Sequence, residues 1–188
     1  NFLRGLHGCP PLELDDELAK EAQHHADHLV HEGKSEHSHG HNKGENIAFK
    51  NAGPDGVLSG EDAANLWYSE IQFYDFDHDT EQMKFGRFSQ VVWKNTTKAG
   101  FGYAKCEKTN DIKVVGQYTP AGNFKGEWGK NIPAPLNGQK WRPAGEPVGD
   151  NPTDVCVKTA MKMKMAGGKK TKITIRTWQR VDGSTYDK

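Results

Sequence analysis

The sequence predicts an α+β fold in which helices come first and an antiparallel β-hairpin follows. Two observations carry this prediction. Apolar residues recur with a helical period in three segments before Gly100, and after it the period changes to the two-residue alternation of strands. The length of 188 residues is enough for one domain with a sizeable core and an appendage of about fifty residues.

The first helical segment is expected over residues 11–32. Asp15 and Asp16 stand near its start and Gly33 follows its end, as helix termini favour. Its apolar stripe consists of Leu14, Leu18, Ala22 and Leu29. Residues 35–60 are polar and Gly-rich, so we expect a long loop there, with residues 47–49 as its apolar patch.

Two further helices are expected over residues 60–74 and 84–94. The buried face of the second helix consists of Ala63, Trp67, Ile71 and Tyr74, and that of the third of Phe85, Phe88 and Val92. Residues 101–105 and 112–118 then alternate like strands, and the polar turn 108–111 joins them into a hairpin.

The domain is expected to span residues 1–133. Residues 134–152 are rich in proline and glycine, a composition typical of an extended linker. Residues 153–188 form a basic tail in which only 172–178 carries a clear strand pattern, and little chain follows to supply its partner. We therefore expect a short β appendage.

Charge and motifs exclude several classes of protein. Lys plus Arg and Asp plus Glu number 25 each, so net charge gives no argument for binding nucleic acid or a membrane surface. No apolar run is long enough to span a bilayer. The three cysteines have no CxxC spacing, and no phosphate-binding or dinucleotide-binding motif is present. Asn95 begins an N-glycosylation triplet, which matters only in a secreted protein.

Glu70 is the most informative single residue. It shares a helical face with Trp67 and Ile71, so the pattern would bury a carboxylate. A buried carboxylate needs a partner, a proton or a metal ion. The alternative is that Glu70 lies at the helix edge in water, and periodicity alone does not separate the two readings.

The first third of the chain is dense in histidine. His24, His28 and His31 follow the i, i+4, i+7 spacing of one helical face, which suits a divalent metal. His37, His39 and His41 alternate in a loop and suit zinc or copper. The simpler reading is that all of these are solvated surface histidines.

Four stretches together resemble the CAP superfamily of cysteine-rich secretory, antigen 5 and pathogenesis-related proteins. Residues 86–96 (GRFSQVVWKNT) and 114–124 (VVGQYTPAGNF) resemble its two signatures. Residues 44–47 (GENI) and the helix around Trp67 resemble the elements that precede them. The few cysteines and the ending 124–133 are most similar to the Golgi-associated, plant pathogenesis-related subgroup.

The resemblance implies a three-layer α-β-α sandwich with a polar cleft. In the family this cleft holds two histidines and two acidic residues, and in some members a divalent metal such as zinc. The matching positions here are His37, Glu45 and Glu70, but Arg87 stands where the second histidine is usual. Arginine cannot ligate a metal at ordinary pH, so we expect weak or absent zinc binding and an ion pair instead. The guanidinium is expected to lower the pKa values of both acids. Gly116 replaces a cysteine that many relatives use in a disulfide.

The resemblance favours a secreted binding protein, with a lipid, a sterol or a protein surface as partner and homodimers known among relatives. An intracellular, Golgi-membrane location is the alternative. A hydrolase that uses Ser38 or Ser89 as nucleophile is a rival function, and metal sequestration by the histidines is a third.

Overall fold

The computed structural model describes residues 1–38, 42–51, 53, 55–77, 82–140, 155–166, 169–179 and 184–187. Of these, 155–166 and 169–179 are described by their backbone alone. The chain divides into two compact units, Asn1–Trp141 and Arg142–Lys188. Within the described residues, no helix is long and apolar enough to cross a membrane.

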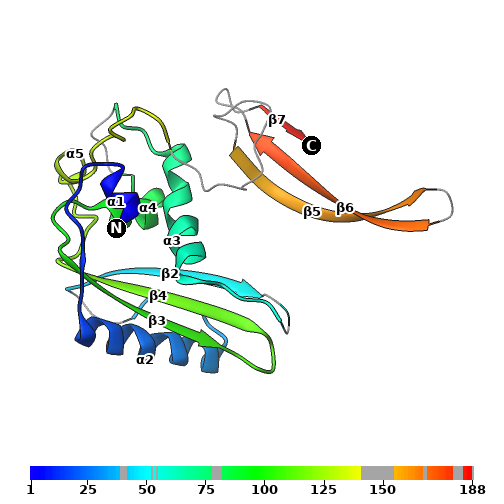
Figure 1. Ribbon diagram of the computed structural model, residues 1–188, viewed down its shortest axis with the longest axis horizontal. Coiled ribbons are helices and arrows are strands. Elements are labelled where there is room, and N and C mark those ends of the chain that lie inside the picture. The colour runs from blue at the N-terminus through cyan, green and yellow to red at the C-terminus, as the bar shows by residue number, and fades with distance from the viewer. Residues whose placement is uncertain are drawn as a thin grey trace. The chain divides into compact units, whose positions relative to one another are not determined.

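The first unit has three layers (Figure 1). Its sheet has the strand order β1-β3-β4-β2, formed by Glu13–Leu14, Lys98–Lys105, Asp111–Thr119 and Gly44–Asn51. Helix α2 (Asp16–Glu32) covers one face. On the other side lie α1 (Phe2–Gly5), α3 (Gly60–Tyr68), α4 (Gly86–Val92) and α5 (Trp128–Asn131). The predicted α-β-α sandwich is confirmed.

Helix α2 starts later than predicted. The Asp15 side chain accepts the backbone N–H groups of Glu17 and Leu18, which fixes the first turn at Asp16. Leu14 was expected on the apolar stripe, but it lies in β1, parallel to β3, and is 80% exposed. Gly33 ends the helix with a φ of 64°, a left-handed conformation that glycine adopts without strain.

Helix α2 lies unusually close to β3. A Cβ atom at Gly100 would lie 2.1 Å from the backbone nitrogen of Ala19, and one at Gly102 would lie 2.3 Å from that of Gln23. Only glycine permits this approach. The core between α2 and the sheet accordingly consists mainly of alanine, at Ala22, Ala26 and Ala104, together with Leu29 and Val115.

The expected loop over residues 35–60 contains a strand that the sequence analysis missed. Strand β2 pairs antiparallel with β4 along its whole length, from Gly44 opposite Tyr118 to Asn51 opposite Asp111. The prediction was wrong because the segment is an edge strand whose pairing supplies its stability, and its buried residues are small or polar. Asn46 and Ala48 are each 1% exposed.

The second and third helices are shorter than predicted. Helix α3 changes at Ser69 to a 3₁₀ turn, η1 (Ser69–Phe73), and the 3₁₀ turn η2 (Met83–Phe85) precedes α4. The expected buried faces are confirmed, except that Phe85 is only partly buried. The β3–β4 hairpin is also confirmed, with Asn110 at a φ of 60° in its turn.

Residues 134–140, in the predicted linker, belong to the first unit and are bonded to its helical side. The backbone N–H of Leu136 donates to the carbonyl of Leu6, and Lys140 Nζ donates to the carbonyls of Gln72 and Tyr74. The rest of the predicted linker lies outside the described residues.

The second unit is a three-stranded antiparallel sheet of order β5-β6-β7. Its strands are Val155–Ala166, Lys169–Gln179 and Thr185–Asp187. The expectation that residues 172–178 lack a partner was wrong, since the preceding Lys/Met run is itself a strand and pairs with them. The Lys/Met run was not predicted as a strand because lysine is uncommon in strands.

Candidate functional site

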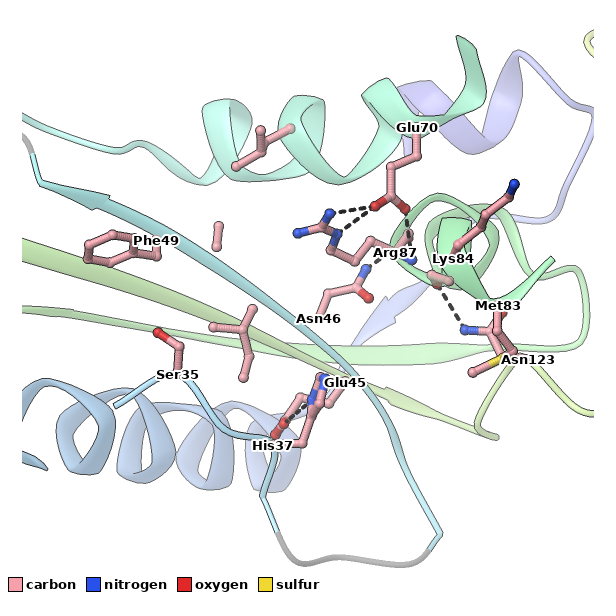
Figure 2. A pocket seen from close by; sticks show the side chains of 14 residues that line it. Ser35, His37, Glu45, Asn46, Phe49, Glu70, Met83, Lys84, Arg87 and Asn123 are labelled. Carbon is pink, nitrogen blue, oxygen red and sulfur yellow. Dashed lines mark hydrogen bonds and ion pairs between the residues drawn. The ribbon is translucent and has the colours of Figure 1, made fainter. Parts of the chain in front are cut away.

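A cleft of about 670 Å³ lies between strand β2 and the segment formed by α3, η1, η2 and α4 (Figure 2). Its polar groups include His37, Glu45, Asn46, Glu70, Arg87 and Asn123. Its apolar wall includes Ile47, Phe49, Leu66 and Met83. The four predicted cleft acids and bases, His37, Glu45, Glu70 and Arg87, all line it and come from different segments, so the fold, and not their spacing in sequence, brings them together.

Glu70 is buried and paired with Arg87. The residue is 9% exposed, and its Oε1 accepts Arg87 Nε at 2.7 Å and Nη2 at 2.6 Å. Its Oε2 accepts the backbone N–H groups of Arg87 and Phe88 at 3.1 and 3.0 Å. These are first-turn donors of α4 that have no partner within the helix. Glu70 therefore joins η1 to α4 and caps that helix.

Glu45 has a separate set of partners. Its Oε1 accepts His37 Nδ1 and the Ser38 backbone N–H, each at 2.9 Å. Its Oε2 accepts the Ser38 hydroxyl at 2.6 Å and Gln117 Nε2 at 3.0 Å. Burial acts to raise the pKa of Glu45, but these hydrogen bonds outweigh it and lower the pKa to about 2. The Glu45 carboxylate in turn raises the pKa of His37.

The expected ion pair of Arg87 forms with Glu70 and not with Glu45. The guanidinium pairs with Glu70, whereas the pKa of Glu45 is lowered by His37, Ser38 and Gln117. Sequence reasoning missed Gln117 and also His25, whose Nε2 lies 3.8 Å from Glu45 Oε1. The burial of His25 on the apolar stripe of α2 was the available signal.

The two candidate nucleophiles have other partners. Ser89 is fully buried, and its hydroxyl is bonded to the Asn123 side chain and to the carbonyls of Phe85 and Gly86. It thus fastens α4 to the loop that follows β4. The Ser38 hydroxyl donates to Glu45.

The histidines of α2 lie outside the cleft. His24, His28 and His31 are all exposed. In the part of the chain that the structure describes, no group of three His, Cys, Asp or Glu side chains converges to hold a metal ion. His39 and His41 lie outside the described residues.

Four other residues noted in the sequence, a sequon asparagine, two cysteines and a glycine, have clear environments. Asn95 is exposed. Cys9 and Cys106 are free thiols, and Cys9 donates to the carbonyl of Val92. A Cβ atom at Gly116 would lie 3.0 to 3.1 Å from atoms of Phe101, Trp67 and Tyr118, so aromatic rings fill the space beside it.

A three-layer sandwich whose cleft holds two carboxylates, each bound by a basic side chain, defines this protein as a CAP-type domain. A sequence model described as "CAP: Cysteine-rich secretory protein family" matches residues 1–118. The chain belongs to this family.

The relatives agree with this assignment. Human Golgi-associated plant pathogenesis-related protein 1 is 36% identical over 130 residues, which cover 68% of this chain and 81% of that protein. Pathogenesis-related protein 1A of Nicotiana tabacum is 34% identical over 68% of this chain and 74% of its own. The predicted family and subgroup are confirmed. Secreted protein RBT4 of Candida albicans is 36% identical, but the match covers only 34% of it.

One solved structure supports the fold directly. It is described as "Crystal structure of NaASP2 with Zn2+" and is 27% identical to this chain, with a TM-score of 0.53. The match covers 62% of this chain and 64% of the other, so the chain spans less than two thirds of that structure.

Proposed function

We propose that this CAP protein acts outside the cell as a binding protein, and that its cleft takes an amphipathic ligand such as a lipid or sterol. The observation that carries the proposal is the unequal lining of the cleft. Phe49, Leu66 and Met83 are 50%, 47% and 54% exposed, so large apolar surfaces face water beside a polar end. Apolar walls with a few converging polar groups are typical of small-molecule sites.

The extracellular location is proposed from relatives. One relative is named a secreted protein, and others are pathogenesis-related proteins. The human relative is named for its Golgi association, which supports the intracellular alternative.

The residues of the cleft do not fit a divalent metal. A permanent positive charge lies 2.6 Å from Glu70, and both oxygens of Glu45 already accept hydrogen bonds. A similar solved structure is described "with Zn2+", and that description concerns that protein alone. We therefore propose that ligand binding at this cleft needs no metal ion.

Binding also explains the cleft better than hydrolysis does. Serine catalysis needs a base that accepts the hydroxyl proton, and a histidine usually supplies it. Here the Ser38 hydroxyl and the His37 ring both bond to Glu45, which lies between them.

Lipid extraction followed by mass spectrometry tests the proposal. Protein purified from its natural source is expected to carry a lipid that organic solvent removes and a chelator does not. A fluorescent fatty acid or sterol should bind the purified protein, and Phe49→Asp with Leu66→Asp should weaken that binding at least tenfold. Leu14→Asp is the matched control, since Leu14 is exposed and lies outside the cleft lining. The proposal fails if no lipid co-purifies and none of the probes binds.

A further inference from the structure

The second unit concentrates positive charge in a chain that is neutral as a whole. The span from Val155 to Gln179 holds seven basic residues and no acidic one, which leaves 18 basic and 25 acidic residues elsewhere. The basic residues are Lys158, Lys162, Lys164, Lys169, Lys170, Lys172 and Arg176. All of them lie in strands β5 and β6, which we call the basic strand pair.

The strand register separates these charges from one another. Every basic residue of the pair stands opposite an uncharged residue, as Lys162 opposite Ile173 and Lys164 opposite Thr171 illustrate. Like charges placed directly opposite each other destabilise a sheet. The register therefore lets two strands carry seven cations without one directly opposed pair.

Apolar residues are interspersed with the cations along both strands. Strand β5 has methionine at positions 161, 163 and 165, with lysine between them. Strand β6 has Ile173, Ile175 and Trp178 among its basic residues. Lysine attracts acidic lipid headgroups, while methionine, isoleucine and tryptophan gain free energy at the boundary of the acyl chains.

We propose that the basic strand pair is a docking surface for an anionic lipid membrane. The strand pair belongs to the second unit and lies outside residues 1–118, which match the CAP family. Order within the second unit comes mainly from one long pairing, since β7 adds only three residues beside β6. An isolated pair of strands is marginal in water, and contact with a lipid surface would bury apolar side chains of this pair.

Two other readings are less well supported by the composition. Six of the seven cations are lysines, whereas proteins that read DNA bases favour arginine. The pair holds a single aromatic residue, Trp178, whereas surfaces for single-stranded nucleic acid use several for stacking. Lysines on an edge strand such as β5 also deter aggregation, and in that case no membrane binding is expected.

Vesicle co-sedimentation of the full chain tests the proposal. Binding is expected to phosphatidylcholine vesicles that contain phosphatidylserine and not to phosphatidylcholine alone. It should weaken strongly as the Debye length falls from about 10 Å at 0.1 M salt to about 3 Å at 1 M. Absence of binding to the anionic vesicles at low salt would overturn the proposal, as would tighter binding to duplex DNA than to the vesicles.

A matched set of variants assigns the binding to the basic strand pair. Four changes together, Lys162→Gln, Lys164→Gln, Lys170→Gln and Lys172→Gln, should weaken vesicle binding by about six-hundredfold, at about fivefold for each lysine. The same four positions changed to Arg should bind like the wild type. If the Gln and Arg sets lose binding equally, positive charge is not the cause and the proposal is wrong.

Two controls separate this surface from the rest of the protein. The exposed lysines Lys94, Lys108, Lys125 and Lys130, changed together to Gln, should leave vesicle binding within a few-fold of the wild type. The double variant Phe49→Asp with Leu66→Asp alters the cleft, and its binding to vesicles should equal that of the wild type. Loss of vesicle binding in the cleft variant would assign the lipid contact to the cleft and overturn the role of the strand pair.

Discussion

The Glu70–Arg87 pair is asymmetric, and this asymmetry gives a quantitative prediction. The Glu70 side chain is 11% exposed, whereas that of Arg87 is 55% exposed. Glu70→Ala removes the acceptor of two backbone N–H groups at the start of α4. Each buried donor left without a partner costs about 1–3 kcal/mol, so we expect the free energy of unfolding to fall by about 3 kcal/mol. Arg87→Ala leaves those two hydrogen bonds in place and removes a half-exposed ion pair. We expect this change to lower the free energy of unfolding by about 1 kcal/mol.

Urea unfolding followed by near-UV circular dichroism measures both losses. The buried Trp67, Trp93 and Trp128 report on the first unit. With a slope of about 2 kcal/mol per molar urea, Glu70→Ala should move the midpoint by about 1.5 M. Glu61→Ala, at an exposed residue of α3, is the control and should cost less than about 0.5 kcal/mol. The reasoning is refuted if Arg87→Ala costs as much as Glu70→Ala.

Three further predictions follow from the packing, the titration and the cleft. Gly100→Ala should lower the free energy of unfolding by about 3 kcal/mol or prevent folding, because its Cβ atom would clash with the backbone of α2. Gly60→Ala, which has open space around it, should leave stability unchanged in the same urea assay. Equal effects of the two changes would contradict the close approach of α2 to β3. The Glu45 bonds stabilise the fold above pH 4.5 and are lost as pH falls toward 2, while the raised pKa of His37 stabilises it below pH 6.5 and less as pH rises. Asp15, Glu32, Asp62 and Asp111 also have lowered pKa values, so Glu45→Gln should make the loss of stability in acid smaller without abolishing it. An unchanged profile of stability against pH would contradict this. Zinc calorimetry should show no tight site in the cleft, and tight binding that Arg87→Ala leaves unchanged would contradict the ion-pair interpretation.

The metal-sequestering alternative has its own test. His24, His28 and His31 are exposed on α2, and sequestration requires that zinc affinity fall when the three are replaced together by Ala. It also requires affinity to fall below about pH 6, as the imidazoles become protonated. Zinc binding that persists in the triple variant would exclude these histidines as the site.

The helices and the β3–β4 hairpin were predictable because their apolar residues are numerous and regularly spaced. Strand β2 was not, since its buried positions are occupied by Asn46 and Ala48, which carry almost no strand signal. Strand β5 was missed for a related reason: lysine at alternate positions obscured a long pairing that is visible only once β6 is placed beside it.

The residues of the candidate site were largely predictable from the sequence, but their pairing was not. Periodicity alone indicated that Glu70 is either buried or at the helix edge, and family resemblance added His37, Glu45 and Arg87. Neither indicated which base pairs with which acid, because that depends on how β2 and α4 face each other across the cleft. The neutral net charge was also misleading, since it averaged a basic strand pair with an acidic remainder.

The glycines of β3 make the contact with α2 intolerant of substitution, whereas positions along the edge strand β2 are more open to it. Where α2 meets Gly100 and Gly102, backbone lies against backbone, and no side chain there can grow without moving the helix. The cleft lies along the edge strand β2, where Phe49, Leu66 and Met83 stand partly in water. A new ligand preference can therefore arise by substitution along this edge while the contact between α2 and β3 keeps the scaffold rigid.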